Sequence, residues 1–256
     1  MDISFDLRKS VSENAKEHYE KSKKYRGKLQ GMVKAIADSK RKLESCVEED
    51  VSAAPRVVKR RQRRWFEPFR WFVSSQGYLV IGGRDATSNE ILVKKHLEPS
   101  DRVFHANVHG APFFIVKNPN GGDVPPETLS EASEAAASYS KAWGKGLGSA
   151  DVYEVAPEQI SKTPPSGEYL PKGSFMVYGE KVWYKNVTLR VTVGLSDDEI
   201  IGGPVDSVSS KTKNYVVLGI GDISQGKLAK IVKSKLGGGE LDDIQGFLPG
   251  GGGKIM

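Results

Sequence analysis

The sequence has little of what would hold a metal, a disulfide framework or a membrane anchor. One cysteine, Cys46, and four histidines are spread over 256 residues. A lone cysteine excludes an intrachain disulfide or a cysteine-based zinc site, and it fits a reducing compartment. The start, MDISFDLRKS, lacks the apolar stretch of a signal peptide. No apolar run approaches the roughly 18 residues that span a bilayer. We therefore expect a cytoplasmic protein without membrane contact.

Hydrophobic residues are also scarce, at 38% of the chain, which is low for one compact globule. The shortfall is local, since residues 1–64 are polar whereas residues 65–118 and 169–195 are apolar and aromatic. The net charge of +6 favours nucleic acid or another anionic surface as partner. Charge alone does not decide between a nucleic-acid binder and an ordinary basic protein.

A long helix is predicted for residues 1–50, started by Ser10 or Ser12 with Glu13 in its first turn. Its face repeats in steps of four and three. That face consists of Val11, Ala15, His18, Ser22, Tyr25, Leu29, Met32, Ile36, Ser39 and Leu43. Polar members weaken this stripe, and two glycines cost about 1 kcal/mol each in a helix interior. A solvated arm and a coiled coil that needs a partner helix both remain open.

A basic run, KRRQRR, occupies residues 59–64 and leads into the aromatic stretch WFEPFRWF. Guanidinium groups match phosphate geometry, so the run is a candidate phosphate contact. The same run is equally consistent with a solvated linker that precedes a buried segment.

Strands and helices alternate irregularly over the rest of the chain, which predicts an α+β fold with a mixed or antiparallel sheet. Strands are predicted around YLVIGG, VFHANV and APFFIV, and again in 150–160, 173–195 and 215–221. Helices are predicted over 84–97, capped by Ser88 or Asp85, over 128–148, capped by Ser130 or Thr128, and over 227–236. The glycine-rich end, LPGGGGKIM, is expected to be frayed.

Two of the four histidines, His105 and His109, lie four residues apart in FHANVHG. On a helix this spacing can hold zinc, but the stretch has no helix signal and no obvious third ligand. On a strand the two would share a face. A metal site, a structural turn beside Gly110 and a contact to a phosphate or base remain the alternatives.

Nucleotide-hydrolysis and hydrolase motifs are missing. SKTPPSGEYLPKGS is not a P-loop, GGRDATSNE is not GxGxxG, and no GxSxG elbow occurs. We therefore expect no enzyme and no cofactor.

Three stretches in one order resemble the NFACT-R domain of ribosome quality-control factors: Trp65–Pro119, Val124–Trp143 and Gln159–Trp183. The stretch His105-Ala106-Asn107-Val108-His109-Gly110 resembles an HAD-x-HG motif of that family, with Asn107 in place of the frequent Asp. The helix resembles the descending half of the family's coiled coil, and the tail resembles archaeal members. The NFACT-N domain of the family is not visible, so a C-terminal part or a short natural form is expected.

The resemblance implies an RNA-binding module of a factor that acts on stalled peptidyl-tRNA on the large ribosomal subunit and supports non-templated tailing. The implied partners are tRNA, ribosomal RNA and proteins of the large subunit, and an NFACT-N half. The expected organisation is a coiled-coil arm (1–50), a basic linker (51–64), the NFACT-R domain (65–195) and an extension (196–256). Two alternatives to the RNA-binding module remain: a scaffold that binds a partner protein through the coiled coil, and an enzyme that acts on nucleic acid through the two histidines.

Nine residues are candidates for RNA contact. The four arginines of the run would contact phosphates, and Arg84 with His105 or His109 would line the surface near them. Lys162 and Tyr169 would join that surface from the proline-rich loop, where Tyr169 would either stack on a base or belong to the core. The candidates are Arg60, Arg61, Arg63, Arg64, Arg84, His105, His109, Lys162 and Tyr169.

Overall fold

The computed structural model describes residues 4–50, 64–163 and 169–256, and for residues 42–50 only the helical backbone. The chain divides into two units, residues 1–62 and residues 63–256. Arg60, Arg61 and Arg63 lie outside the described residues. Within the described ranges, no helix is both long enough and apolar enough to cross a membrane.

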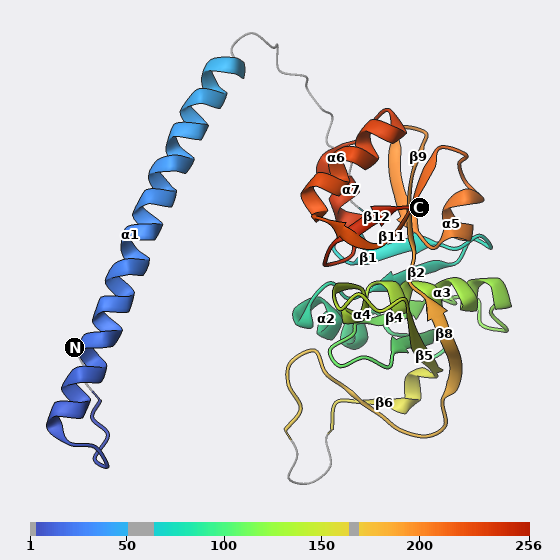
Figure 1. The fold of residues 1–256 in the computed structure, drawn as a ribbon. Helices are drawn as coiled ribbons and strands as arrows, with labels where there is room; N and C mark the ends of the chain where they lie inside the picture. Colours follow the sequence, from blue (N-terminus) through green and yellow to red (C-terminus); the bar gives the residue numbers. More distant parts are fainter. Residues whose placement is uncertain (1–3, 51–63, 164–168) are drawn as a thin grey trace. The chain divides into compact units, whose positions relative to one another are not determined.

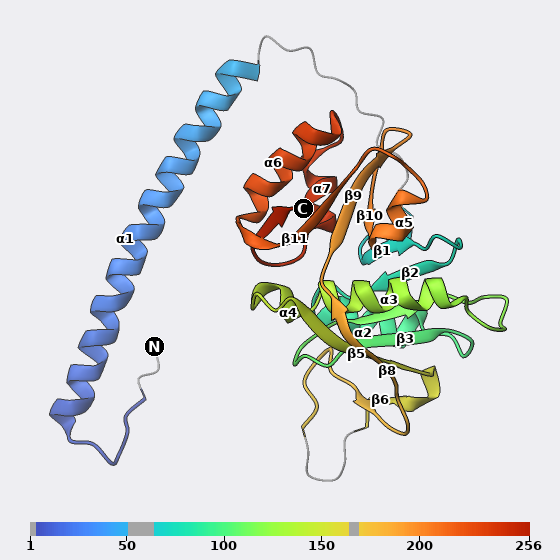
Figure 2. The ribbon, with the colours of Figure 1, turned by 45° about the vertical axis from the view of Figure 1, so that its right-hand side comes forward.

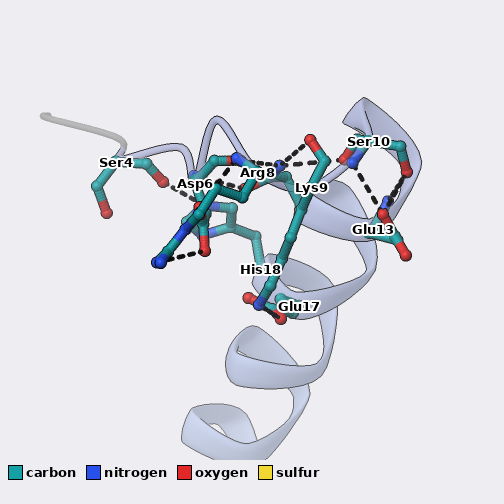
Figure 3. Close-up of polar contacts among 9 residues, drawn as sticks. Ser4, Asp6, Arg8, Lys9, Ser10, Glu13, Glu17 and His18 are labelled. Carbon is teal, nitrogen blue, oxygen red and sulfur yellow. Dashed lines mark hydrogen bonds and ion pairs between the residues drawn. The ribbon is translucent and has the colours of Figure 1, made fainter.

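The first unit is one helix, α1 (Val11–Asp50), preceded by a hook of residues 4–10 that folds back on it. Asn14 is 5% exposed, and its side-chain amide donates to the carbonyls of Asp6, Lys9 and Ser10. Ser10 and Glu13 cap each other, which confirms one of the predicted starts. Figure 3 shows the bonds between Ser10 and Glu13 and the bond between the His18 ring and the Ser4 carbonyl. The hook therefore satisfies donors that a bare helix start leaves without partners.

The second unit contains a six-stranded antiparallel sheet in the order β1-β2-β4-β3-β5-β8. Its strands are β1 (Arg70–Val73), β2 (Leu79–Gly82), β3 (Arg102–Ala106), β4 (Phe113–Val116), β5 (Ser149–Val155) and β8 (Val182–Thr188). Both faces of the inner strands are covered, so Phe113–Val116 is buried at every position. This explains why β4 reads as a continuous apolar run rather than an alternating one.

Two helices cover the opposite faces of this sheet. The alanine-rich α3 (Pro126–Ser138) packs on the face that carries Phe104 and Phe114. The shorter α2 (Ala86–His96) places Leu92 among Val103 and Ile115 on the other face. Figure 2 shows α3 running along the sheet. The small alanine side chains allow the helix to approach the sheet closely.

A second antiparallel sheet follows in the order β10-β9-β11-β12. Its elements are β9 (Val191–Ser196), β10 (Glu199–Gly203), α5 (Val205–Ser209), β11 (Tyr215–Ile223), α6 (Gln225–Leu236), α7 (Leu241–Phe247) and β12 (Gly253–Ile255). They gather on one side of the six-stranded sheet, coloured orange to red in Figure 1. The new sheet begins at β9, five residues before the extension that the sequence analysis predicts.

Three sequence expectations differ from the structure. The tail is not frayed, because Gly253 and Lys254 pair with Ile220 and Gly219 of β11. The helix predicted for 128–148 ends at Ser138, and a separate short helix, α4 (Lys141–Gly144), follows. Neither Ser130 nor Thr128 caps α3; Pro125 occupies the cap position, and Pro126 starts the helix.

The described parts of the segment between β5 and β8 pack on the sheet face that α2 covers, through Ile160, Phe175 and Val177. The segment holds a short helix, η1 (Pro157–Gln159), and a two-stranded ribbon of β6 (Ile160–Ser161) and β7 (Met176–Val177). Its described part after residue 168 lies against the start of α2, and it forms one wall of the site below.

Candidate nucleic-acid interface

A groove of about 870 Å³ opens where the start of α2, the β3–β4 loop, α4 and the β6–β7 segment meet. Among its described lining residues, five are lysines or arginines and one is a carboxylate, Asp85. The cations are Arg70, Arg84, Lys141, Lys172 and Lys181. Asp85 is already engaged as the cap of α2, accepting from the Ser88 backbone N–H at 2.7 Å. The groove therefore carries a concentrated positive field.

Arg70 is the most confined of these cations. Its guanidinium stacks on the Tyr139 ring at 4.3 Å and donates to the Leu248 carbonyl at 3.4 Å. Burial lowers its pKa from the usual value. Within the described residues, neither Arg70 nor Arg84 pairs with a carboxylate. A confined charge without a counter-ion is unfavourable, so the Arg70 guanidinium is suited to an incoming anion, and the exposed Arg84 adds a second charge beside it.

Tyr139 fixes Arg70 in place. Its hydroxyl donates to the Phe247 carbonyl at 2.7 Å, and its ring stacks on Phe114. Burial raises its pKa to about 12, so the phenol stays neutral and offers Arg70 a ring face rather than a counter-ion.

One buried amide holds the wall of the groove. Asn89, 5% exposed, donates to the Gly173 carbonyl at 2.7 Å and accepts from the Phe113 N–H at 2.9 Å. It thereby joins α2, β4 and the segment after residue 168. Gly173 has a φ of +78°, and a Cβ there would lie 2.5 Å from the Ala86 carbonyl oxygen, so the close approach requires glycine.

The two histidines have different surroundings. His105 lies on β3, and its Nε2 donates to the Ala111 carbonyl at 2.9 Å, which closes the β3–β4 loop. Burial lowers its pKa to about 4, so it is neutral at pH 7. His109 is exposed beyond the end of β3, beside Gly110 at a φ of +71°. Among the described residues no group of three metal-ligating side chains forms. The structural-turn alternative therefore fits His105 best.

The predicted contact residues fall into separate places. Arg84, His105 and His109 line the groove. Arg64 instead pairs with Glu67 and Glu199, and its guanidinium lies over Trp71. Lys162 is bonded to Glu90 and to the Ser174 carbonyl, so it braces the wall. Tyr169 is 86% exposed, which makes its assignment to the core wrong.

Four cations of the groove were missed by sequence reasoning. Arg70 stands on β1, Lys141 on α4, and Lys172 and Lys181 both on the segment between β5 and β8, and no charge run marks them. Only Arg70 carries a signal in the sequence, because it is a charged residue within the aromatic stretch WFEPFRWF.

Comparison with known proteins is consistent with this site. Residues 68–179 match the family model of the NFACT protein RNA binding domain. The chain is 41% identical over 203 residues to the archaeal Rqc2 homolog aRqcH of Methanocaldococcus jannaschii, covering 77% of this chain and 30% of that protein. It is 42% identical over 172 residues to the human ribosome quality control complex subunit NEMF, covering 66% and 16%.

A solved structure, the C-terminal part of the fibronectin/fibrinogen-binding protein from Streptococcus suis, is 17% identical and covers 80% of each chain with a TM-score of 0.41. That likeness is too weak to carry an argument. The chain spans less than a third of the length of the curated relatives it matches. On its matched domain and these relatives, the chain belongs to the NFACT family of ribosome quality-control factors.

Proposed function

We propose that the groove binds the phosphate backbone of RNA, and that the chain is the RNA-binding module of a ribosome quality-control factor. The observation that supports this most directly is the set of five cations in a groove of the NFACT-R domain. The one carboxylate among the described lining residues, Asp85, is engaged as the N-cap of α2. Phosphate contacts supply most of the affinity of such modules.

The finer assignment is proposed from the resemblance to the NFACT family. The RNA would be tRNA or large-subunit ribosomal RNA, met on a subunit that carries a stalled peptidyl-tRNA, with non-templated tailing as the activity the module supports. None of the relatives named above is described as an enzyme, and the groove is proposed as a binding surface rather than a catalytic one. The proposed location is the cytoplasm, with ribosomes.

The α1 helix favours a second role as a docking arm. Its predicted stripe is solvent-exposed, with Tyr25, Leu29, Met32 and Ile36 between 56% and 63% exposed. A helix with so much apolar surface is stabilised by a partner helix. The proposed partner is the NFACT-N half of the factor, and binding should be lost when Leu29 and Ile36 become aspartate.

The test of RNA binding is a titration with tRNA at several salt concentrations. An Arg84→Ala/Lys141→Ala/Lys172→Ala variant removes three exposed groove charges. Its matched control, Lys227→Ala/Lys230→Ala/Lys235→Ala, removes three exposed charges from α6. The groove variant should bind more weakly, with a slope of log K against log salt smaller by about 2 to 3. Equal behaviour of the two variants would contradict the assignment.

The basic run needs its own arm of the experiment. An Arg60→Ala/Arg61→Ala/Arg63→Ala/Arg64→Ala variant tests the predicted phosphate contacts that precede the domain. If the run contacts RNA, the salt slope should fall further when this change is combined with the groove variant.

A further inference from the structure

An aromatic row crosses four adjacent strands of the six-stranded sheet. Phe113 of β4 lies opposite His105 of β3, His105 opposite Tyr153 of β5, and Tyr153 opposite Trp183 of β8. Directly opposed residues share one face of a sheet. The successive ring centroids are 4.6, 5.4 and 5.4 Å apart, so the rings form a continuous row.

The row leads from the groove to the edge of the sheet. Phe113, His105 and Tyr153 line the groove, and Phe113 and Tyr153 are 3% and 7% exposed. Trp183, at the other end, is 41% exposed on the outermost strand. An exposed indole that continues a buried aromatic row offers a flat apolar surface next to the positive groove.

Lysines flank the open end of the row. Lys181, which lines the groove, holds its ammonium 4.3 Å from the Tyr153 ring centre and 6.0 Å from that of Trp183. Lys185 lies 4.3 Å over the Trp183 ring and bonds to Asp151. The Lys185 side chain is 59% exposed, so it can leave the ring face for an incoming group.

We infer that this end of the groove takes an unpaired nucleotide of RNA, with its base stacked on Trp183 and its phosphate held by Lys181. This inference rests on the proposed function, because the RNA strand reaches Trp183 through the basic groove. Stacking on an aromatic side chain beside cations is the usual chemistry for single-stranded RNA. A base within a duplex is stacked on its neighbours and is not available to the indole.

The exposed edge of β8 could instead accept an extended peptide by strand addition. The lysines at both sides of Trp183 argue against that occupant, because edge lysines are a common means of preventing strand pairing. A polyanion complements the same two charges, which is why we commit to RNA.

The experiment compares the full chain with Trp183→Ala and Trp183→Phe, using a single-stranded oligoribonucleotide and a fully paired duplex of the same length. Trp183→Ala should weaken single-strand binding about 5- to 150-fold, the range for one lost stack. Duplex affinity and the salt slope should stay unchanged, because no phosphate contact is lost. Trp183→Phe should restore most of the affinity.

A matched control, Tyr215→Ala, removes an exposed aromatic side chain from β11. Thermal unfolding of each variant verifies that the fold is kept. Unchanged single-strand affinity in Trp183→Ala, while the groove variant loses binding, would overturn this inference and leave the proposed function standing; the edge would then be open to a peptide. Absence of RNA binding by the unchanged chain would overturn both.

Discussion

Truncation of Asn89 tests how the wall of the groove is held. In Asn89→Ala, the Phe113 N–H loses its acceptor inside the sheet, and the Gly173 carbonyl loses its donor. A buried group left without a partner costs about 1–3 kcal/mol, and the carbonyl, which is nearer to solvent, should fall at the low end. Alanine returns up to about 0.7 kcal/mol through its higher helix propensity. The net loss should be about 1–3 kcal/mol.

Urea unfolding followed by circular dichroism measures this loss, with Asn120→Ala in an exposed turn as control. The same preparations are titrated with tRNA, since release of the wall moves Lys172 away from the other cations. We expect lower stability and weaker RNA binding together. A loss below about 0.5 kcal/mol would refute the reasoning, because it would mean that the two bonds contribute nothing net.

Three further predictions concern the loop, the pH response and the tail. Gly173→Ala should weaken RNA binding in the tRNA titration, because its Cβ meets the Ala86 backbone; Gly121→Ala, with φ of +67° and open space around it, serves as control and should leave RNA affinity unchanged. The His105 pKa lies at about 4, below its usual 6.5, so protonation favours the unfolded chain. The contribution of His105 to stability is complete above pH 6.5 and should be lost as pH falls towards 4. The urea midpoint of unfolding should therefore fall over this pH range, and it should fall less in His105→Gln. Trp143→Phe removes the donor to the Gly252 carbonyl, 2.8 Å away, and should cost about 1–2 kcal/mol and speed amide exchange in residues 253–255.

Local signals predicted the elements whose ends are set by neighbouring residues. Asp85 and Ser88 form the capping box at the start of α2, and Gly110 supplies the left-handed bend between β3 and β4. Both features involve residues within a few positions of each other, so the sequence could narrow the cap to Ser88 or Asp85 and place the bend at Gly110.

Tertiary contacts decided the features that the sequence analysis missed. The predicted helix over 128–148 breaks after Ser138 because Tyr139 is held by Arg70 and Phe247, far away in the chain. Four glycines near the C-terminus predict fraying, yet residues 253–255 pair with β11 and are anchored by Trp143. No local propensity reports a bond to a residue about a hundred positions away.

The candidate site shows the same limit more sharply. A run such as KRRQRR attracts attention because its charges are adjacent in the sequence, but adjacency alone does not place them at a common site in the fold. The groove instead collects single cations from separate segments and holds Arg70 against a neutral phenol, with no carboxylate partner among the residues that the structure describes. That arrangement costs stability unless an anion completes it, and the cost is what distinguishes a binding site from a solvated charge run. The sequence could indicate a basic, RNA-binding class of protein; only the packing of Tyr139, Asn89 and Gly173 determines where the charges converge.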